Sequence, residues 1–348
     1  MASKVPELRL HGIQALRAIA AIIVTVFHAH LYLPDDQPRH IYLFGFGEAG
    51  VPIFFVISGL IMVITTSDDA RYRPLEFFRR RLIRIFPIYW VFVALYLLGA
   101  VLIGKHYNLS QQDLVGAILL VPGKAGGVIG SGWTLPFELY FYFAFGITRI
   151  LPLDRAVPAL SALFIVLIGI GAATHPANDW LKEVTNPIQL EFLAGAWIGW
   201  LAARGKLPVR LGPLLVAVAV ALFAIGIGLG YRRIPLTISW GVPSAILVLG
   251  VVSWEAGNRA GRVVRALGRL GNSSYVLYLA HMLITAIAIF AMRRIWGGVP
   301  PAPITVSLCI TVLAIGLSHL AHLGIEQPLQ RWLSPRRNAR PVARPLPN

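Results

Sequence analysis

Ten apolar stretches, each long enough to cross a lipid bilayer as a helix, restrict the fold of this chain more than any other feature. The chain is 57% hydrophobic and only 13% charged, and its mean hydropathy of +0.70 lies outside the range of soluble domains. The predicted fold class is therefore all-α, a polytopic transmembrane bundle of about ten spanning helices. The stretches lie at residues 13–33, 48–66, 85–103, 132–150, 156–173, 187–203, 211–229, 235–252, 273–291 and 303–322.

The charged residues are distributed unevenly between the two sides that such a bundle would have. The 31 Lys and Arg residues outnumber the 15 Asp and Glu residues, and most fall on the cytoplasmic side if the N-terminus is cytoplasmic. An even number of spans then places the C-terminus there too. The net charge of +16 indicates a basic face against anionic membrane lipid and no nucleic acid partner. We predict one membrane domain over residues 1–330 and a disordered, Pro- and Arg-rich cytoplasmic tail over 331–348.

Two ionisable residues, Arg17 and His28, lie within the first apolar stretch. Eleven residues at about 100° each make almost three full turns, so both side chains lie on one face of a helix, about 16 Å apart along its axis. Ionisable groups in a spanning helix are costly and usually face the protein interior. The pair therefore marks a candidate functional site.

The second stretch and the segment after it contain small and basic residues. Ser58 brings a hydroxyl into the bundle, and nearby glycines allow close helix packing, which is the simpler interpretation of that stretch. Arg81 and Arg84 are three residues apart on one helix face, and arginine forks suit phosphate oxygens. The alternative for these arginines is an ordinary cluster that sets membrane orientation. The residues concerned are Gly45, Gly47, Gly50 and Gly59, followed by Arg79, Arg80, Arg81 and Arg84.

Glu138 is a carboxylate in the apolar fourth stretch, close in sequence to Trp133, Tyr140 and Tyr142. A buried, unpaired carboxylate takes up a proton or finds a partner. Arg17 and His28 are the expected partners, and a purely structural ion pair is the alternative.

Other histidines and the single cysteine suggest packing more than metal chemistry. His281 in the ninth stretch is either functional or a satisfied packing residue, and His319 and His322 form an interfacial pair. Glu326 should have a basic partner because it opposes the helix dipole. Cys309 stands alone and no span contains a metal-ligand spacing of histidines, so no metal site is predicted.

Six fragments in this order resemble the acyltransferase-3 family of bacterial integral membrane acyltransferases, from about residue 12 to about residue 330. The first two are most similar to the exopolysaccharide-production acetyltransferase branch. The resemblance implies about ten spans in the bacterial cytoplasmic (inner) membrane. It also implies transfer of an acetyl or other short acyl group from acyl-CoA to a lipid-linked or surface carbohydrate. The fragments are ALRAIAAIIVTVFHA, VPIFFVISGLIM, FFRRRLIRIFPIYW, GSGWTLPFELYFYF, GNSSYVLYLAH and IEQP.

The resemblance also implies roles for individual residues. The family's signature of arginine, ten residues and histidine falls on Arg17 and His28, and its loop arginines fall on Arg81 and Arg84. His28 is then the predicted general base. Glu138 would hold its tautomer, and Arg17 would bind the CoA pyrophosphate or polarise the thioester. The predicted acyl-CoA-binding residues are Arg17, Arg80, Arg81 and Arg84. The predicted substrate-binding residues are Ser58, Trp133, Tyr140 and His281.

Three other functions fit the same residues. A transporter or flippase of a lipid-linked sugar would use Arg17, His28 and Glu138 as a relay. A structural subunit of a polysaccharide-export assembly would use them for packing. An acyltransferase acting on a small diffusible glycosylated acceptor would keep the chemistry and change the acceptor. The sequence favours no particular oligomeric state.

Overall fold

The computed structural model describes residues 10–32, 44–104, 107, 109–297 and 302–333, and helices account for all of their regular secondary structure. The predicted all-α fold class is confirmed; most of the predicted C-terminal tail, residues 334–348, lies outside the described residues. The α-helices are α1 His11–Leu31, α3 Gly50–Thr65, α4 Pro74–Leu102, α5 Gln111–Ile118, α6 Leu135–Thr148, α7 Leu153–Thr174, α8 Asp179–Val184, α9 Gln189–Ala203, α10 Gly212–Gly228, α11 Val242–Gly257, α12 Arg262–Gly271, α13 Ser274–Trp296, α14 Pro303–Ala321 and α15 Gln327–Leu333.

Eight helical segments of the described chain are long and apolar enough to cross a membrane, so the protein is a polytopic helical bundle. Two of the ten predicted spans are shorter helices. The 14 residues of α6 and the 15 residues of α9 reach only about 21–23 Å, less than the hydrocarbon core of about 30 Å. The 132–150 stretch is divided because Gly130–Thr134 forms a 3₁₀ turn before Pro136 in the first turn of α6.

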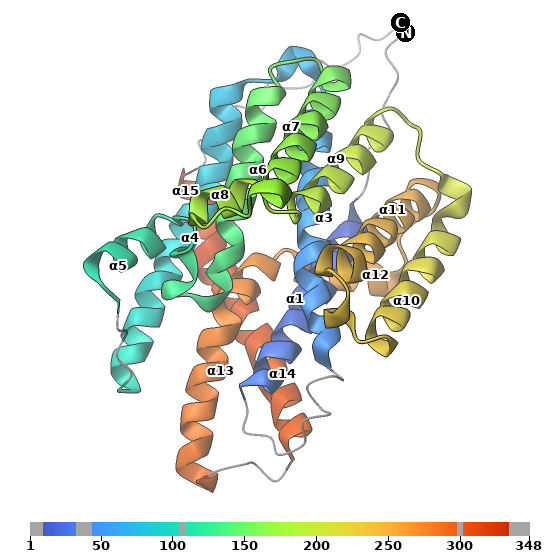
Figure 1. Ribbon diagram of the computed structural model, residues 1–348. Coiled ribbons are helices and arrows are strands. Elements are labelled where there is room, and N and C mark those ends of the chain that lie inside the picture. Colours follow the sequence, from blue (N-terminus) through green and yellow to red (C-terminus); the bar gives the residue numbers. More distant parts are fainter. Residues whose placement is uncertain (1–9, 33–43, 105–106, 108, 298–301, 334–348) are drawn as a thin grey trace, which may run out of the picture.

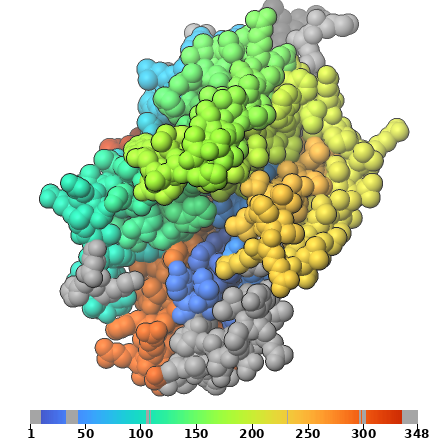
Figure 2. All heavy atoms as spheres, in the orientation of Figure 1, coloured from blue at the N-terminus to red at the C-terminus, as the bar shows by residue number. Residues whose placement is uncertain are grey.

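Helices α1 and α3 lie at the centre of the bundle. Of the residues in their apolar windows, 61% and 67% are buried, compared with 17% for the segment containing α10 and 22% for α7. The chain after α6 wraps around this centre (Figure 1), and in the space-filling view α1 shows only between the flanking elements (Figure 2). The apolar side chains of α7 and α10 therefore face outward, where a membrane protein meets lipid.

Glycines allow α3 and α9 to pack backbone to backbone. A Cβ atom on Gly195 would lie 1.9 Å from the carbonyl oxygen of Val56, and one on Gly59 would lie 2.0 Å from that of Phe192. Helices in membranes associate through such close contacts because lipid provides no hydrophobic drive between them. The predicted packing role of the second stretch is thus seen in the structure, since Gly47 approaches the carbonyl oxygen of Ile23 in the same way.

One buried guanidinium joins two connections at the end of the bundle where α4 begins. The Arg149 side chain is 1% exposed and donates to the carbonyl oxygens of Thr66 and Leu151 at 2.6–3.1 Å. It also pairs with Asp69 at 2.5 Å. The ring of Tyr72 lies 5.0 Å from the guanidinium. This network fixes the α3–α4 connection and therefore the first turns of α4.

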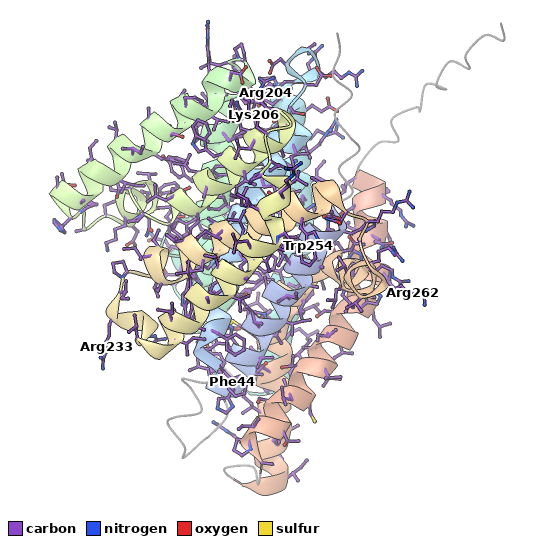
Figure 3. The ribbon with its side chains drawn as sticks, turned by 90° about the vertical axis from the view of Figure 1, so that its right-hand side faces the viewer. Phe44, Arg204, Lys206, Arg233, Trp254 and Arg262 are labelled. Carbon is purple, nitrogen blue, oxygen red and sulfur yellow. The ribbon has the colours of Figure 1, made fainter. Side chains whose placement is uncertain are left out.

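Basic side chains gather at this same end. Figure 3 shows Arg204 and Lys206 there, with Arg233 and Phe44 toward the opposite end. The basic residues near this end include Arg71 and Arg73 of the α3–α4 connection, Arg149, Arg204 and Lys206.

Replacement of Gly195 by alanine should destabilise the bundle because the new methyl group must displace backbone. Overpacking of this kind typically removes about 1–3 kcal/mol. The melting temperature of the detergent-solubilised protein should fall. The matched control is Gly169→Ala in α7, where a Cβ atom meets nothing within 4 Å. Equal melting temperatures for the two variants would contradict this packing.

Candidate active site

A cavity between α1, α3, α4, α6 and α13 brings five of the predicted site residues together. It encloses about 760 Å³, counting the part that is open to solvent. Each of these helices supplies at least one polar side chain. The predicted residues in its lining are Arg17, Ser58, Arg81, Arg84 and Glu138, joined by Thr134, Tyr142, Ser274, Tyr275 and Tyr278.

Three guanidinium groups line this cavity at different depths. Arg84 is exposed and marks the solvent side, whereas Arg17 and Arg81 are partly buried. Arg81 lies over the rings of Phe77 and Tyr142, at 5.5 and 5.7 Å from their centroids. Within the described residues, neither Arg17 nor Arg84 forms an ion pair or hydrogen bond. Two cationic groups are therefore available to a ligand.

Glu138 is the single carboxylate in the cavity lining. It accepts hydrogen bonds from the hydroxyl of Ser58, at 3.1 Å, and from the hydroxyl of Tyr142 one turn along α6. The sequence-based pairing of Glu138 with His28 differs from this arrangement. Glu138 is instead close enough to Arg17 to attract it electrostatically.

The charge balance of the cavity favours an anionic ligand. Three guanidiniums face one carboxylate in a partly buried space, where charges are poorly screened and repel one another. Arg17 is repelled by Arg84. An anion relieves this repulsion, and the planar forks of arginine bind phosphate oxygens in pairs. The cavity thus has the composition of a site for a phosphate-bearing ligand.

His28 lies farther along α1 and contacts a second histidine. His281 of α13 places its Nε2 3.3 Å from Nδ1 of His28, and the ring centroids are 5.0 Å apart. Neither histidine is part of the cavity lining. Tyr278 connects the two regions, because it lines the cavity and its ring centroid lies 5.9 Å from that of His281.

Besides the two histidines, three other predicted residues lie outside the cavity lining. Arg80 is exposed and paired with Glu76 one turn earlier in α4. Trp133 is 47% exposed and packs edge-on against Phe137. Tyr140 faces the other side of α6, where it packs against Phe164 at 5.6 Å. Their binding roles stay predictions.

Sequence reasoning did not single out several residues that the fold brings to the site. Ser274, Tyr275 and Tyr278 belong to the fragment SSYVLY, whose one-turn spacing places them on the cavity side of α13. Glu48 begins the predicted second stretch and is close enough to His28 to interact with it electrostatically. The signal for Glu48 was its charge beside an apolar run.

Glu326 has the basic partner that the sequence predicts. The partner is His322, whose Nδ1 lies 2.5 Å from the Glu326 carboxylate. His322 and Glu326 are the first and last residues of a single π-helical turn after α14. His319 stacks on His322 with ring centroids 6.3 Å apart. Across the described parts of the chain, no three His, Cys, Asp or Glu side chains cluster as a metal site requires.

The fold and the cavity together define an integral membrane protein with a basic, ligand-sized site inside its helical bundle. Residues 10–321 match the family described as "Acyltransferase domain". The chain belongs to this family, the acyltransferase-3 family of bacterial integral membrane acyltransferases.

Individual relatives agree with this assignment. The exopolysaccharide production protein ExoZ of Rhizobium meliloti is 34% identical over 83% of this chain and 91% of its own length. The O-acetyl transferase of Shigella phage Sf6 is 30% identical over 46% of this chain and 52% of its own length. The acyltransferase MdmB of Streptomyces mycarofaciens is 26% identical over 96% of this chain and 94% of its own length. No solved structure gives a significant match.

Replacement of Glu138 by glutamine should lower the stability of the ligand-free protein, because three guanidiniums then repel one another without a carboxylate. At low ionic strength we expect the melting temperature to fall by about 2–4 °C. Added salt should restore most of the difference by screening. Ser58→Ala is the control, since it removes a hydrogen bond to Glu138 and no charge. If the melting temperature of Glu138→Gln stayed equally low after salt was added, this account would be contradicted.

Proposed function

We propose that this protein transfers a short acyl group, acetyl in the first instance, from acyl-CoA to a hydroxyl group of a lipid-linked or cell-surface carbohydrate. The single observation that carries the proposal is the convergence of Arg17, Arg81 and Arg84 on one cavity, whose lining residue Tyr278 neighbours the His281–His28 pair. Membership of an acyltransferase family supports the reaction class. The names of ExoZ and of the phage O-acetyl transferase support a carbohydrate-related acceptor and an oxygen nucleophile.

The donor enters from the basic end of the bundle. Positive connections lie on the cytoplasmic side of bacterial inner-membrane proteins, which supports a cytoplasmic location for this end and access of acyl-CoA to its cavity. Arg84 at the mouth and Arg81 behind it bind the phosphate groups of CoA. Arg17 binds the pyrophosphate or polarises the thioester. The uncharged pantetheine arm then extends past Tyr278 toward His28, about 16 Å farther along α1.

At His28 the acceptor hydroxyl loses its proton as it attacks. The imidazole accepts the proton from the hydroxyl, the hydroxyl oxygen bonds to the thioester carbonyl carbon, and the carbon–sulfur bond breaks. His28 then returns the proton to the departing thiolate, which leaves as CoA. The products are the O-acyl ester and free CoA, and His28 is again neutral. The acceptor reaches His28 from the end opposite the basic connections.

The His28→Ala variant should lose acetyl transfer by about 10²–10⁴-fold, because the imidazole that accepts the hydroxyl proton is removed. Purified protein in liposomes, supplied with labelled acetyl-CoA and with carbohydrate extracted from the host membrane, measures this transfer. Binding of CoA should be unchanged. Near-normal transfer by His28→Ala would refute the general-base role.

The same assay distinguishes the other functions. A transporter or flippase would transfer no label in the wild-type protein and would respond to an ion gradient. An enzyme for a small diffusible acceptor would label a soluble glycoside and leave the membrane carbohydrate unlabelled.

The Arg84→Ala variant should weaken donor binding and leave the chemical step almost unchanged. We expect the KM for acetyl-CoA to rise about tenfold, with kcat within about twofold, because a cationic phosphate contact is lost. Arg80→Ala is the matched control. Arg80 carries the same charge in the same helix turn but is exposed and paired with Glu76 outside the cavity. Equal increases in KM for both variants would show that only the general positive charge matters.

A further inference from the structure

His281 is a buried polar side chain that the proposed mechanism has not yet used. It is 0% exposed and lies in α13, where its Nδ1 is 3.1 Å from the carbonyl oxygen of Leu277. Its Nε2 points at His28 from 3.3 Å. The two rings therefore meet between α1 and α13, with their planes tilted by 56°.

The hydrogen-bond partners determine which nitrogen of each ring carries the proton. A carbonyl oxygen only accepts, so Nδ1 of His281 donates to Leu277, and Nε2 of the neutral ring is left as an acceptor. By the same argument Nδ1 of His28 donates to Val24, at 2.9 Å, and shares this proton with Nε2 of His281. His28 is thereby held as the tautomer whose Nε2 has a free lone pair.

The backbone around His281 is itself held in place. The hydroxyl of Tyr96 in α4 donates to the carbonyl oxygen of Leu279 at 2.9 Å and accepts from the amide of Leu283 at 3.0 Å. A side chain from another helix thus bonds α13 on both sides of His281. The acceptor offered to His28 is therefore fixed by two packed helices.

We propose that His281 is a positioning residue that orients His28 and stabilises the imidazolium formed during transfer. This inference rests on the proposed function. When Nε2 of His28 takes the hydroxyl proton, its Nδ1–H strengthens the bonds to Val24 and His281, and the proton on Nε2 later passes to the thiolate. The carboxylate of a Ser-His-Asp triad has the same task. A neutral imidazole performs it without the desolvation of a second charge in the membrane.

Two substitutions at position 281 test the role. His281→Leu removes the acceptor and should lower kcat about 10²-fold, with the KM for acetyl-CoA within about twofold. His281→Gln places an amide oxygen near the position of Nε2 and should recover about tenfold of that loss. Thr285→Val is the matched control, since it replaces another buried polar side chain one turn along α13. It should leave both constants within about twofold.

A double substitution separates a role through His28 from a general structural role. In the His28→Ala background, His281→Leu should cause no further loss of the residual rate, because residues that act as a unit are non-additive. The inference would be overturned if His281→Leu lowered the residual rate of His28→Ala further. It would also be overturned if His281→Leu raised the KM for acetyl-CoA by as large a factor as it lowered kcat, or if His281→Gln recovered no activity. If His28→Ala remains active, the proposed function fails. If His28→Ala is inactive and His281→Leu keeps its kcat, only the role of His281 fails.

Discussion

A guanidinium group in a membrane-spanning helix must be kept away from lipid, and much of this structure follows from that requirement. Arg17 lies two turns into α1, so α1 must be enclosed on the face that carries it. The enclosing helices reach it because glycines remove side chains where α3 meets its neighbours. Arg17 forms no ion pair or hydrogen bond within the described residues, so its charge is directed into the cavity that it lines. The same constraint that shapes the bundle therefore creates a site for an anion.

The site is divided by depth into a charged part and a neutral part. The cavity near the basic end holds three guanidiniums and Glu138, whereas the histidines beyond Tyr278 contact each other and backbone carbonyl oxygens. This division matches the chemistry of a CoA thioester, whose phosphates are charged and whose reacting end is not. In the proposed reaction, phosphates bound near the solvent would retain part of their hydration, and only uncharged atoms would need to move toward the membrane interior.

The sequence predicts the spanning helices more accurately than it predicts the contacts between them. Apolar length predicts eight of the ten spans, whereas glycine and proline shorten α6, α9 is short and packed inside the bundle, and α4 begins at Pro74, well before the predicted residue 85. Helical periodicity places Arg17 and His28 on one face, but it says nothing about which other helix meets each residue. Glu138 therefore pairs with Ser58 and Tyr142, and His281 meets His28, because of the packing of α6 and α13 against α1. Such pairings depend on long-range contacts that no local pattern encodes.

Helix α13 contributes residues to both parts of the site, the cavity and the histidine pair. Ser274, Tyr275 and Tyr278 line the cavity on its first two turns, and His281 follows one turn later. Its position along the bundle is set by side chains of other segments. The hydroxyl of Tyr275 donates to the carbonyl oxygen of Ile85 at 3.1 Å, and Ser131 donates to that of Tyr278 at 3.0 Å. A shift of α13 would therefore move the cavity wall and the partner of His28 together. The cavity wall and the hydrogen-bond partner of His28 thus belong to one helix.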